Sequence, residues 1–250
     1  MKKYTCIYHL IGAFLAISVL PLSIQAQESN GLMNVRIVTV KQDHVRDWID
    51  LQRELTESMK EAGAPGRSIW EVVKGDHNTF HILTNLDGWA DYDNPGENGM
   101  TDTQWANWLN EILPTIQSRQ ELTVRTFRPL DIPDPDGSKR NLLGLRRHMI
   151  KHNHTADFYG WLRDRLVPTL KKLGEEGRYF GRVIAGDDTA IYYHARSIDS
   201  WAQLDEPFAF AALSESERTK LFDEDRGDWI IKSEQIILQY REDLSFQSDD

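Results

Sequence analysis

The chain carries one pattern twice. Short matches recur in the same order about 110 residues apart, and the spacing lengthens slowly along the chain. Self-similarity with this period predicts two copies of one folding unit, because chance matches would not keep their order over four segments. The matched ranges are 40–48 with 150–158, 66–76 with 177–187, 87–90 with 199–202, and 127–128 with 240–241.

Each copy is expected to have the order strand, helix, strand, strand, helix, strand. Apolar residues recur every three or four positions over 45–62 and 158–173, which predicts an amphipathic first helix in each copy. Pro168 predicts a kink in the second of these helices, because proline lacks a backbone N–H. The β-branched runs predict strands at 33–41, 67–74, 79–85 and 122–128, and at 142–151, 178–185, 190–196 and 236–241.

A proline-rich stretch without apolar periodicity separates the copies and predicts a linker. The expected organisation is a signal peptide at 1–26, a first repeat at 27–130, a linker at 131–141, and a second repeat with a short tail at 142–250.

The first residues have the layout of a cleavable export signal. Lys2 and Lys3 precede an apolar stretch at 10–20, and Ala26 ends the segment. We therefore expect export to the periplasm or the exterior. The single cysteine, Cys6, lies inside this signal, so burial must stabilise the mature protein. No later segment approaches the roughly 20 apolar residues of a membrane span, so no membrane insertion is expected. A formal net charge of −10 argues against a nucleic-acid partner.

The element order resembles the dimeric α/β-barrel superfamily, a ferredoxin-like group that includes antibiotic-biosynthesis monooxygenases, stress-responsive barrel domains and NIPSNAP-like proteins. The resemblance implies an α+β fold of two tandem ferredoxin-like βαββαβ repeats, whose antiparallel sheets pack together as an intramolecular pseudo-dimer. It also implies a pocket between the sheets for a small, largely apolar molecule. Several members oxidise such molecules or bind haem.

Strand alternation predicts which residues face this pocket. In the third strand of the second copy we expect the more apolar residues to face the helices, which turns their neighbours inward. Such a cavity is expected to bind an anionic or phenolic compound, with a histidine as general base and an arginine stabilising negative charge. The alternative is that these groups pair with carboxylates across the sheets. The candidates are Arg36, Glu71, His81, Arg146, His148, Arg182, Tyr192, His194 and Arg196.

His44 and His154 occupy equivalent places where the first strand of each copy meets the first helix. They are candidate catalytic groups at the barrel mouth, together with His194; alternatively they help to start the helices. His148, His152 and His154 have a spacing that would bring three imidazoles to one strand face. No metal is predicted there, because the first copy lacks this pattern and no carboxylate has suitable spacing.

Three functions remain open from the sequence. The leading one is an exported protein that binds a small organic molecule between its sheets, with an oxygenase-like or isomerase-like reaction. The second is a non-catalytic interaction module that uses the acidic segment 214–228. The third is a haem or metal protein that uses His148, His154 or His194. The sequence identifies no particular cofactor.

Overall fold

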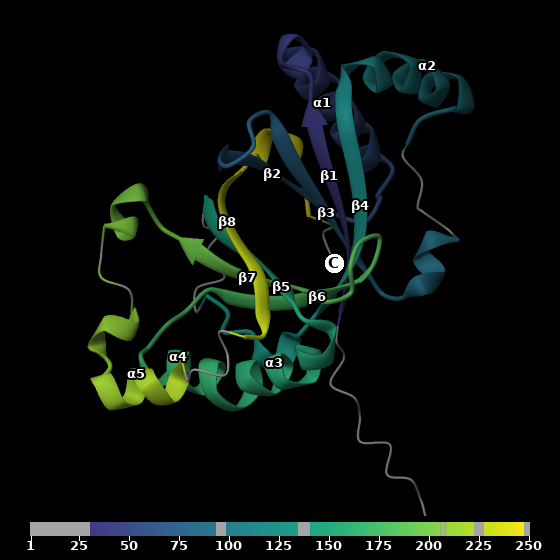
Figure 1. Cartoon of the computed structure of the whole chain (residues 1–250). Coiled ribbons are helices and arrows are strands. Elements are labelled where there is room, and N and C mark those ends of the chain that lie inside the picture. The colour runs from purple at the N-terminus through teal and green to yellow at the C-terminus, as the bar shows by residue number, and fades with distance from the viewer. Residues whose placement is uncertain are drawn as a thin grey trace, which may run out of the picture.

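Eight antiparallel strands form a closed barrel in the computed structural model of the chain (Figure 1). The structure describes residues 31–93, 99–134, 141–205, 207, 209–222 and 228–247. The predicted signal peptide lies outside these residues, as does part of the acidic segment. The strands are β1 (Leu32–Val40), β2 (Arg67–Lys74), β3 (Thr79–Leu86), β4 (Ile116–Thr126), β5 (Leu142–Ile150), β6 (Arg178–Ala185), β7 (Ile191–Ile198) and β8 (Ile230–Tyr240).

The strand order around the barrel is β1-β3-β2-β8-β5-β7-β6-β4. Each repeat contributes its own four-stranded sheet, and the two sheets join through the pairs β2–β8 and β4–β6. The sheet therefore has no free edge strand, and the interior face that one ferredoxin-like unit would expose is covered by the other. The predicted fold class and tandem pseudo-dimer are confirmed.

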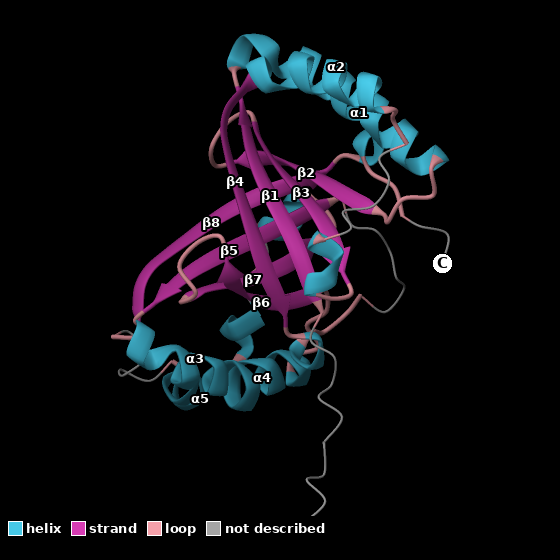
Figure 2. Cartoon of the chain, turned by 90° about the vertical axis from the view of Figure 1, so that its right-hand side faces the viewer, coloured by secondary structure: helices cyan, strands magenta, loops and turns pink. Residues whose placement is uncertain are grey.

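The helices cover the outside of the barrel, on opposite sides for the two repeats (Figure 2). The first repeat supplies α1 (Val45–Glu61) and α2 (Asp102–Ile112), and the second supplies α3 (Thr155–Trp161), α4 (Val167–Lys172) and α5 (Glu215–Leu221). A π-helical turn, Leu162–Leu166, separates α3 from α4 just before Pro168, in the helix for which a kink was predicted. Among the described residues, no helix is long and apolar enough to cross a membrane.

Apolar side chains pack on both faces of the sheets. Outside the barrel, Trp48 of α1 is fully buried and stacks on Phe80 of β3, with ring centroids 4.3 Å apart. The second repeat places Phe158 against Tyr192 at the equivalent position, but edge to face, with ring centroids 4.9 Å apart. A further cluster that includes Leu122 lies inside the barrel. The strands are consequently buried on both faces, which weakens the alternation that marks a half-exposed strand.

Candidate functional site

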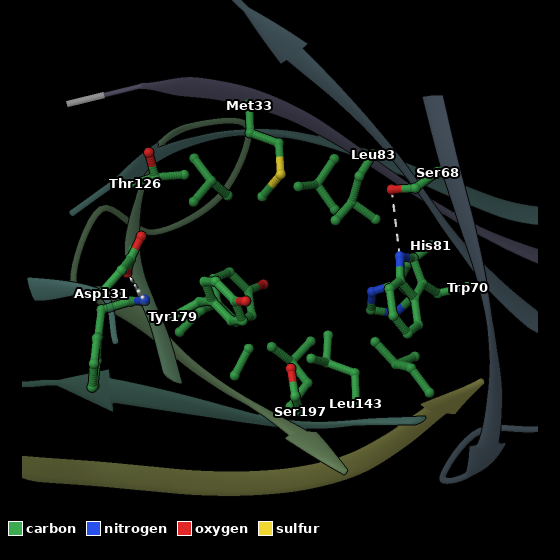
Figure 3. Close-up of a pocket in the computed structure, with 18 of the residues that line it drawn as sticks. Met33, Ser68, Trp70, His81, Leu83, Thr126, Asp131, Leu143, Tyr179 and Ser197 are labelled. Atoms are coloured by element: carbon green, nitrogen blue, oxygen red, sulfur yellow. Dashed lines mark hydrogen bonds between the residues drawn. The ribbon is translucent and has the colours of Figure 1, made fainter. Parts of the chain in front are cut away.

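A cavity of about 400 Å³ opens inside the barrel at the end where β1, β2, β5 and β6 begin (Figure 3). Most of its wall is apolar or aromatic, and all eight strands contribute to it. Among the described residues that line it, none is a lysine or an arginine. The polar and aromatic lining residues are Ser68, Trp70, His81, Thr126, Asp131, Asp134, Tyr179, Phe180, Tyr193, Ser197, Tyr240 and Gln247.

His81 is the one predicted candidate that lines this cavity. The residue is 6% exposed, and burial lowers the pKa of its imidazole to about 4. The ring is therefore neutral at pH 7 and has one nitrogen available as a proton acceptor. No described side chain or backbone group hydrogen-bonds to it. His81 lies opposite Trp70 on β2, and Trp70 in turn lies opposite Tyr240 on β8, so an imidazole, an indole and a phenol share one level of the wall.

The large aromatic side chains at this level of the cavity wall are not repeated in the second repeat. Gly181 lies at the place equivalent to Trp70, and a Cβ atom there would lie 2.9 Å from Val124 Cγ1 and 3.0 Å from the carbonyl oxygen of Arg125. Tyr193 takes the place of His81, and burial raises the pKa of its phenol. The cavity is therefore asymmetric, and its titratable imidazole comes from the first repeat.

Two carboxyl groups that the sequence did not single out lie at the cavity mouth, on residues assigned to the linker. Asp131 accepts a hydrogen bond from the backbone N–H of Phe180 at 2.9 Å. Burial raises the pKa of Asp131 to about 7, although this hydrogen bond and the charge of Arg128 oppose the rise. Asp134 accepts hydrogen bonds from the hydroxyls of Ser197, at 2.8 Å, and Tyr179, at 3.3 Å.

A repeat signal for Asp131 does exist in the sequence. The segment after β8 crosses β2 as the segment after β4 crosses β6, and Ser245 accepts a hydrogen bond from Ile69 N–H as Asp131 does from Phe180 N–H. The duplication thus extends a few residues past the predicted boundary, and pairing 131 with 245 would have marked this position.

The inward orientation predicted for most other candidates is wrong by one residue. On β7 it is Tyr193, Ala195 and Ser197 that line the cavity. The prediction failed because it assigned the more apolar set to the helix side, whereas a closed barrel buries both faces. Tyr192 shows this plainly, since it packs in the helix-side core and donates a hydrogen bond to the carbonyl of Thr155. The residues that face the helices instead are Arg36, Glu71, Arg146, His148, Arg182, Tyr192, His194 and Arg196.

In the first repeat these residues form ion pairs, as the alternative interpretation expected. Arg36 lies 3.3 Å from Glu121, which also accepts a hydrogen bond from Asn34 at 2.9 Å. Glu71 pairs with Arg241 at 2.8 Å and so links the two repeats.

In the second repeat the predicted residues do come together, but on the outer face of the sheet. His194 lies opposite Arg146, and His148 lies opposite Tyr192. The His194 ring stacks on Phe180 with centroids 4.7 Å apart, while Arg182 lies 5.9 Å from the centre of the Tyr192 ring.

His44 and His154 lie at the other end of the barrel from the cavity, beyond the ends of β1 and β5. Each precedes the first helix of its repeat and contacts an aspartate of the first helical turn, at 3.1 Å for Asp47 and 2.9 Å for Asp157. These contacts fit the helix-starting role, and neither imidazole lines the cavity.

His148, His154 and His194, the histidines considered for a haem or metal site, do not line the cavity. β5 ends at Ile150, and His152–His154 form a turn, so the three spaced imidazoles do not share a strand face. Among the described residues, no group of three or more His, Cys, Asp or Glu side chains is placed to hold a metal ion. His148 lies against Phe158, with ring centroids 5.7 Å apart, on the side away from the cavity.

Comparison with known proteins shows that the chain is similar in fold to several solved structures. No protein-family model matches the chain, and no curated protein matches it. A solved candidate monooxygenase from Lactobacillus acidophilus is 9% identical and has a TM-score of 0.58, over 88% of this chain and 97% of that one. An anthrone oxidase-like protein is 12% identical with a TM-score of 0.56, over 89% and 95%. A mutant chlorite dismutase from Candidatus Nitrospira defluvii is 7% identical with a TM-score of 0.53, over 86% and 95%. The chain thus has the dimeric α/β-barrel fold.

Proposed function

We propose that the chain binds a small aromatic molecule inside the barrel and that His81 accepts a proton from it. The observation that carries this proposal is the cavity of about 400 Å³, in which a buried neutral imidazole faces an otherwise apolar and aromatic wall. A concave, mostly apolar site with a few polar groups and one strongly perturbed pKa is typical of ligand and active sites.

The charges of the lining narrow the ligand class. Asp131 and Asp134 lie at the mouth, and none of the described lining residues carries a guanidinium or ammonium group. An anionic ligand would meet carboxylates without a counter-charge, whereas a neutral phenol or an aromatic amine would not. Trp70, Tyr179 and Tyr240 offer ring faces and edges for stacking. We therefore favour a neutral or cationic aromatic ligand over an anionic one.

An oxygenase-like reaction suits this arrangement. His81 would take a proton from an activated C–H group, and the resulting carbanion would be oxidised by dioxygen. For a methylene group the balance is CH₂ + O₂ → C=O + H₂O, so one oxygen atom enters the product and the other leaves as water. An imidazole with a pKa near 4 is a weak base at rest, but negative charge that develops on the ligand beside it raises that pKa. The likeness to monooxygenase-type structures supports this reaction class.

The test uses the mature chain with anthrone and 1-naphthol as probes, each titrated by tryptophan fluorescence. Ala195→Phe places a ring in the cavity and is expected to weaken binding about tenfold or more, whereas the exposed Ala212→Phe should leave it unchanged. His81→Gln should bind anthrone normally but consume dioxygen about a hundredfold more slowly in an oxygen electrode. Equal binding by both phenylalanine variants would contradict the proposed site.

Export is part of the same proposal. The signal predicted for residues 1–26 would place the barrel in the periplasm or outside the cell. Mass spectrometry of the protein recovered from those compartments should give an N-terminus at Gln27. An intact N-terminus on protein retained in the cytoplasm would contradict export.

A further inference from the structure

Five basic side chains gather on the outer, helix-facing side of the second repeat's sheet, outside the cavity. We name them the basic cluster: Arg146, His148, Arg178, His194 and Arg196. Arg146 lies opposite His194, and Arg178 lies opposite Arg196. His148 is on the same face of β5 as Arg146, two residues farther along. Three adjacent strands therefore present basic side chains to one region.

The first repeat shows what balances such a surface. There Arg36 lies between Ile82 and Glu121, and the Glu121 carboxylate pairs with it. In the second repeat Arg146 lies between His194 and Gln235, and the Gln235 amide oxygen accepts its hydrogen bond at 2.7 Å. The second repeat has thus replaced the carboxylate by an uncharged amide at the same register.

The same exchange adds basic side chains. Val38, Ile82 and Thr84 of the first repeat are replaced by His148, His194 and Arg196. Glu175 forms an ion pair with Arg178 of the basic cluster. Arg146 and Arg196 form no ion pair with any described acidic residue. Of the three guanidinium groups in the cluster, only that of Arg178 forms an ion pair with a carboxylate of the described residues.

His194 lies at the centre of this imbalance. Burial, followed by the charges of Arg178, His148, Arg146 and Arg196, holds the pKa of His194 well below its usual value. The ring is consequently neutral, and its buried Nε2 has no hydrogen-bond partner among the described residues. A buried polar atom without a protein partner is a place where a bound group or a water molecule can complete the hydrogen bonding.

We propose that the basic cluster is a second binding site, which takes an oxyanion such as a phosphate or carboxylate group. Guanidinium groups bind both groups through paired N–H donors, and a partly desolvated setting strengthens the attraction. The anion would supply the negative charge that Glu121 supplies in the first repeat. It would also accept a hydrogen bond from the Nε2–H tautomer of His194. This site is independent of the cavity, which lies on the other face of the same sheet.

The test is calorimetric titration of the mature chain with inorganic phosphate in one arm and succinate in the other, at low ionic strength in a non-coordinating buffer. The two arms distinguish a phosphate site from a carboxylate site. Gln235→Glu restores the carboxylate of the first repeat, and Arg196→Thr restores its threonine. Each is expected to weaken binding about tenfold or more, because a charged hydrogen bond contributes about 1.5–3 kcal/mol. Gln42→Glu adds the same charge at an exposed position in the first repeat and should change nothing.

The chemical shift of the His194 imidazole should change when an anion binds. It would not change if the basic cluster had only a structural role. Anion binding should raise the pKa of this imidazole in the wild type and leave it unchanged in Gln235→Glu, whose melting temperature should be at least that of the wild type. The proposal is overturned if neither anion binds, or if Gln235→Glu and Gln42→Glu bind the anion equally. If the wild-type chain bound phosphate but not 1-naphthol, only the cavity proposal would be contradicted.

Discussion

The two repeats pack their first helices on their sheets through equivalent aromatic contacts, but they pair the equivalent arginines with different groups. Trp48 on Phe80 and Phe158 on Tyr192 occupy equivalent places and keep each first helix on its sheet. Two residues farther along the same face of the sheet, the first repeat pairs its arginine with Glu121, whereas the second has Gln235. The two repeats thus share the apolar contacts that hold the barrel, whereas the polar partners of their equivalent arginines differ.

The largest expected effect tests the shared part of this comparison. Trp48→Ala and Phe158→Ala each remove a fully buried ring and should lower the free energy of unfolding by about 3–5 kcal/mol. Because β2–β8 and β4–β6 join the repeats into one barrel, both variants should unfold in a single transition. Urea denaturation followed by fluorescence and circular dichroism checks this. Two separate transitions would show that the repeats unfold independently.

The next effect concerns the cavity, where His81 in the first repeat corresponds to Tyr193 in the second. The folded-state pKa of His81 is about 4, below that of the unfolded chain, so the unfolded state binds the extra proton between these values. Stability should therefore fall as the pH drops from about 6.5 to about 4, by roughly 2–3 kcal/mol. His81→Gln should abolish this dependence in melting curves.

Asp131 has the opposite sign and must be separated from His81. Its folded-state pKa is about 7, so the native state holds a proton that the unfolded state releases. Stability should therefore fall as the pH rises from about 4 to about 7, and Asp131→Asn should remove that fall. Melting temperatures of the two single variants and the double variant across this range measure both terms. A double variant that kept the wild-type profile would contradict both assignments.

A smaller effect tests the ion pair of the first repeat. Hydrogen bonds from Asn34 and Arg119 and the charge of Arg36 outweigh burial and lower the pKa of Glu121 to about 2. This carboxylate therefore stabilises the fold above about pH 4.5, and the contribution is lost as the pH falls toward 2. Because the side chain is partly exposed, Glu121→Gln should cost only about 1 kcal/mol at pH 7. Urea denaturation at pH 7 and pH 3 should show a smaller difference at pH 3 than at pH 7.

The smallest effect is the reverse exchange. Gln235→Glu should stabilise the second repeat by roughly 0.5–1 kcal/mol, since it gives Arg146 a partly exposed carboxylate. Denaturation in low and high salt checks this, because the gain should shrink as salt screens the pair. A loss of stability would mean that the second repeat already balances its charge.

The repeat and the fold class were predictable from the sequence because they depend on features that short windows carry. Apolar spacing gave the helices, and ordered matches gave the duplication. The orientation of the strands was not predictable in the same way. In a closed barrel both Tyr192 and Tyr193 are largely buried, so hydrophobicity alone does not tell the cavity face from the helix face.

The candidate site was only partly predictable for a second reason. His81 was found because it is the inward residue of its strand, but Asp131 and Asp134 belong to a segment whose prolines indicated a linker. Their position depends on how that segment crosses β6, which is a tertiary contact. Four members of the basic cluster, Arg146, His148, His194 and Arg196, were predicted as site residues, but an error of one residue placed them on the wrong face, and Arg178 was not predicted.

The most direct test of the account is a titration with two ligands, because the account assigns two sites to the two faces of one sheet. 1-Naphthol and phosphate should bind together, each with an affinity unchanged by saturation with the other. Ala195→Phe should lose 1-naphthol and keep phosphate, and Gln235→Glu should do the reverse. Competition between the two ligands, or their joint loss in either variant, would contradict the separation of an aromatic cavity from an anion site.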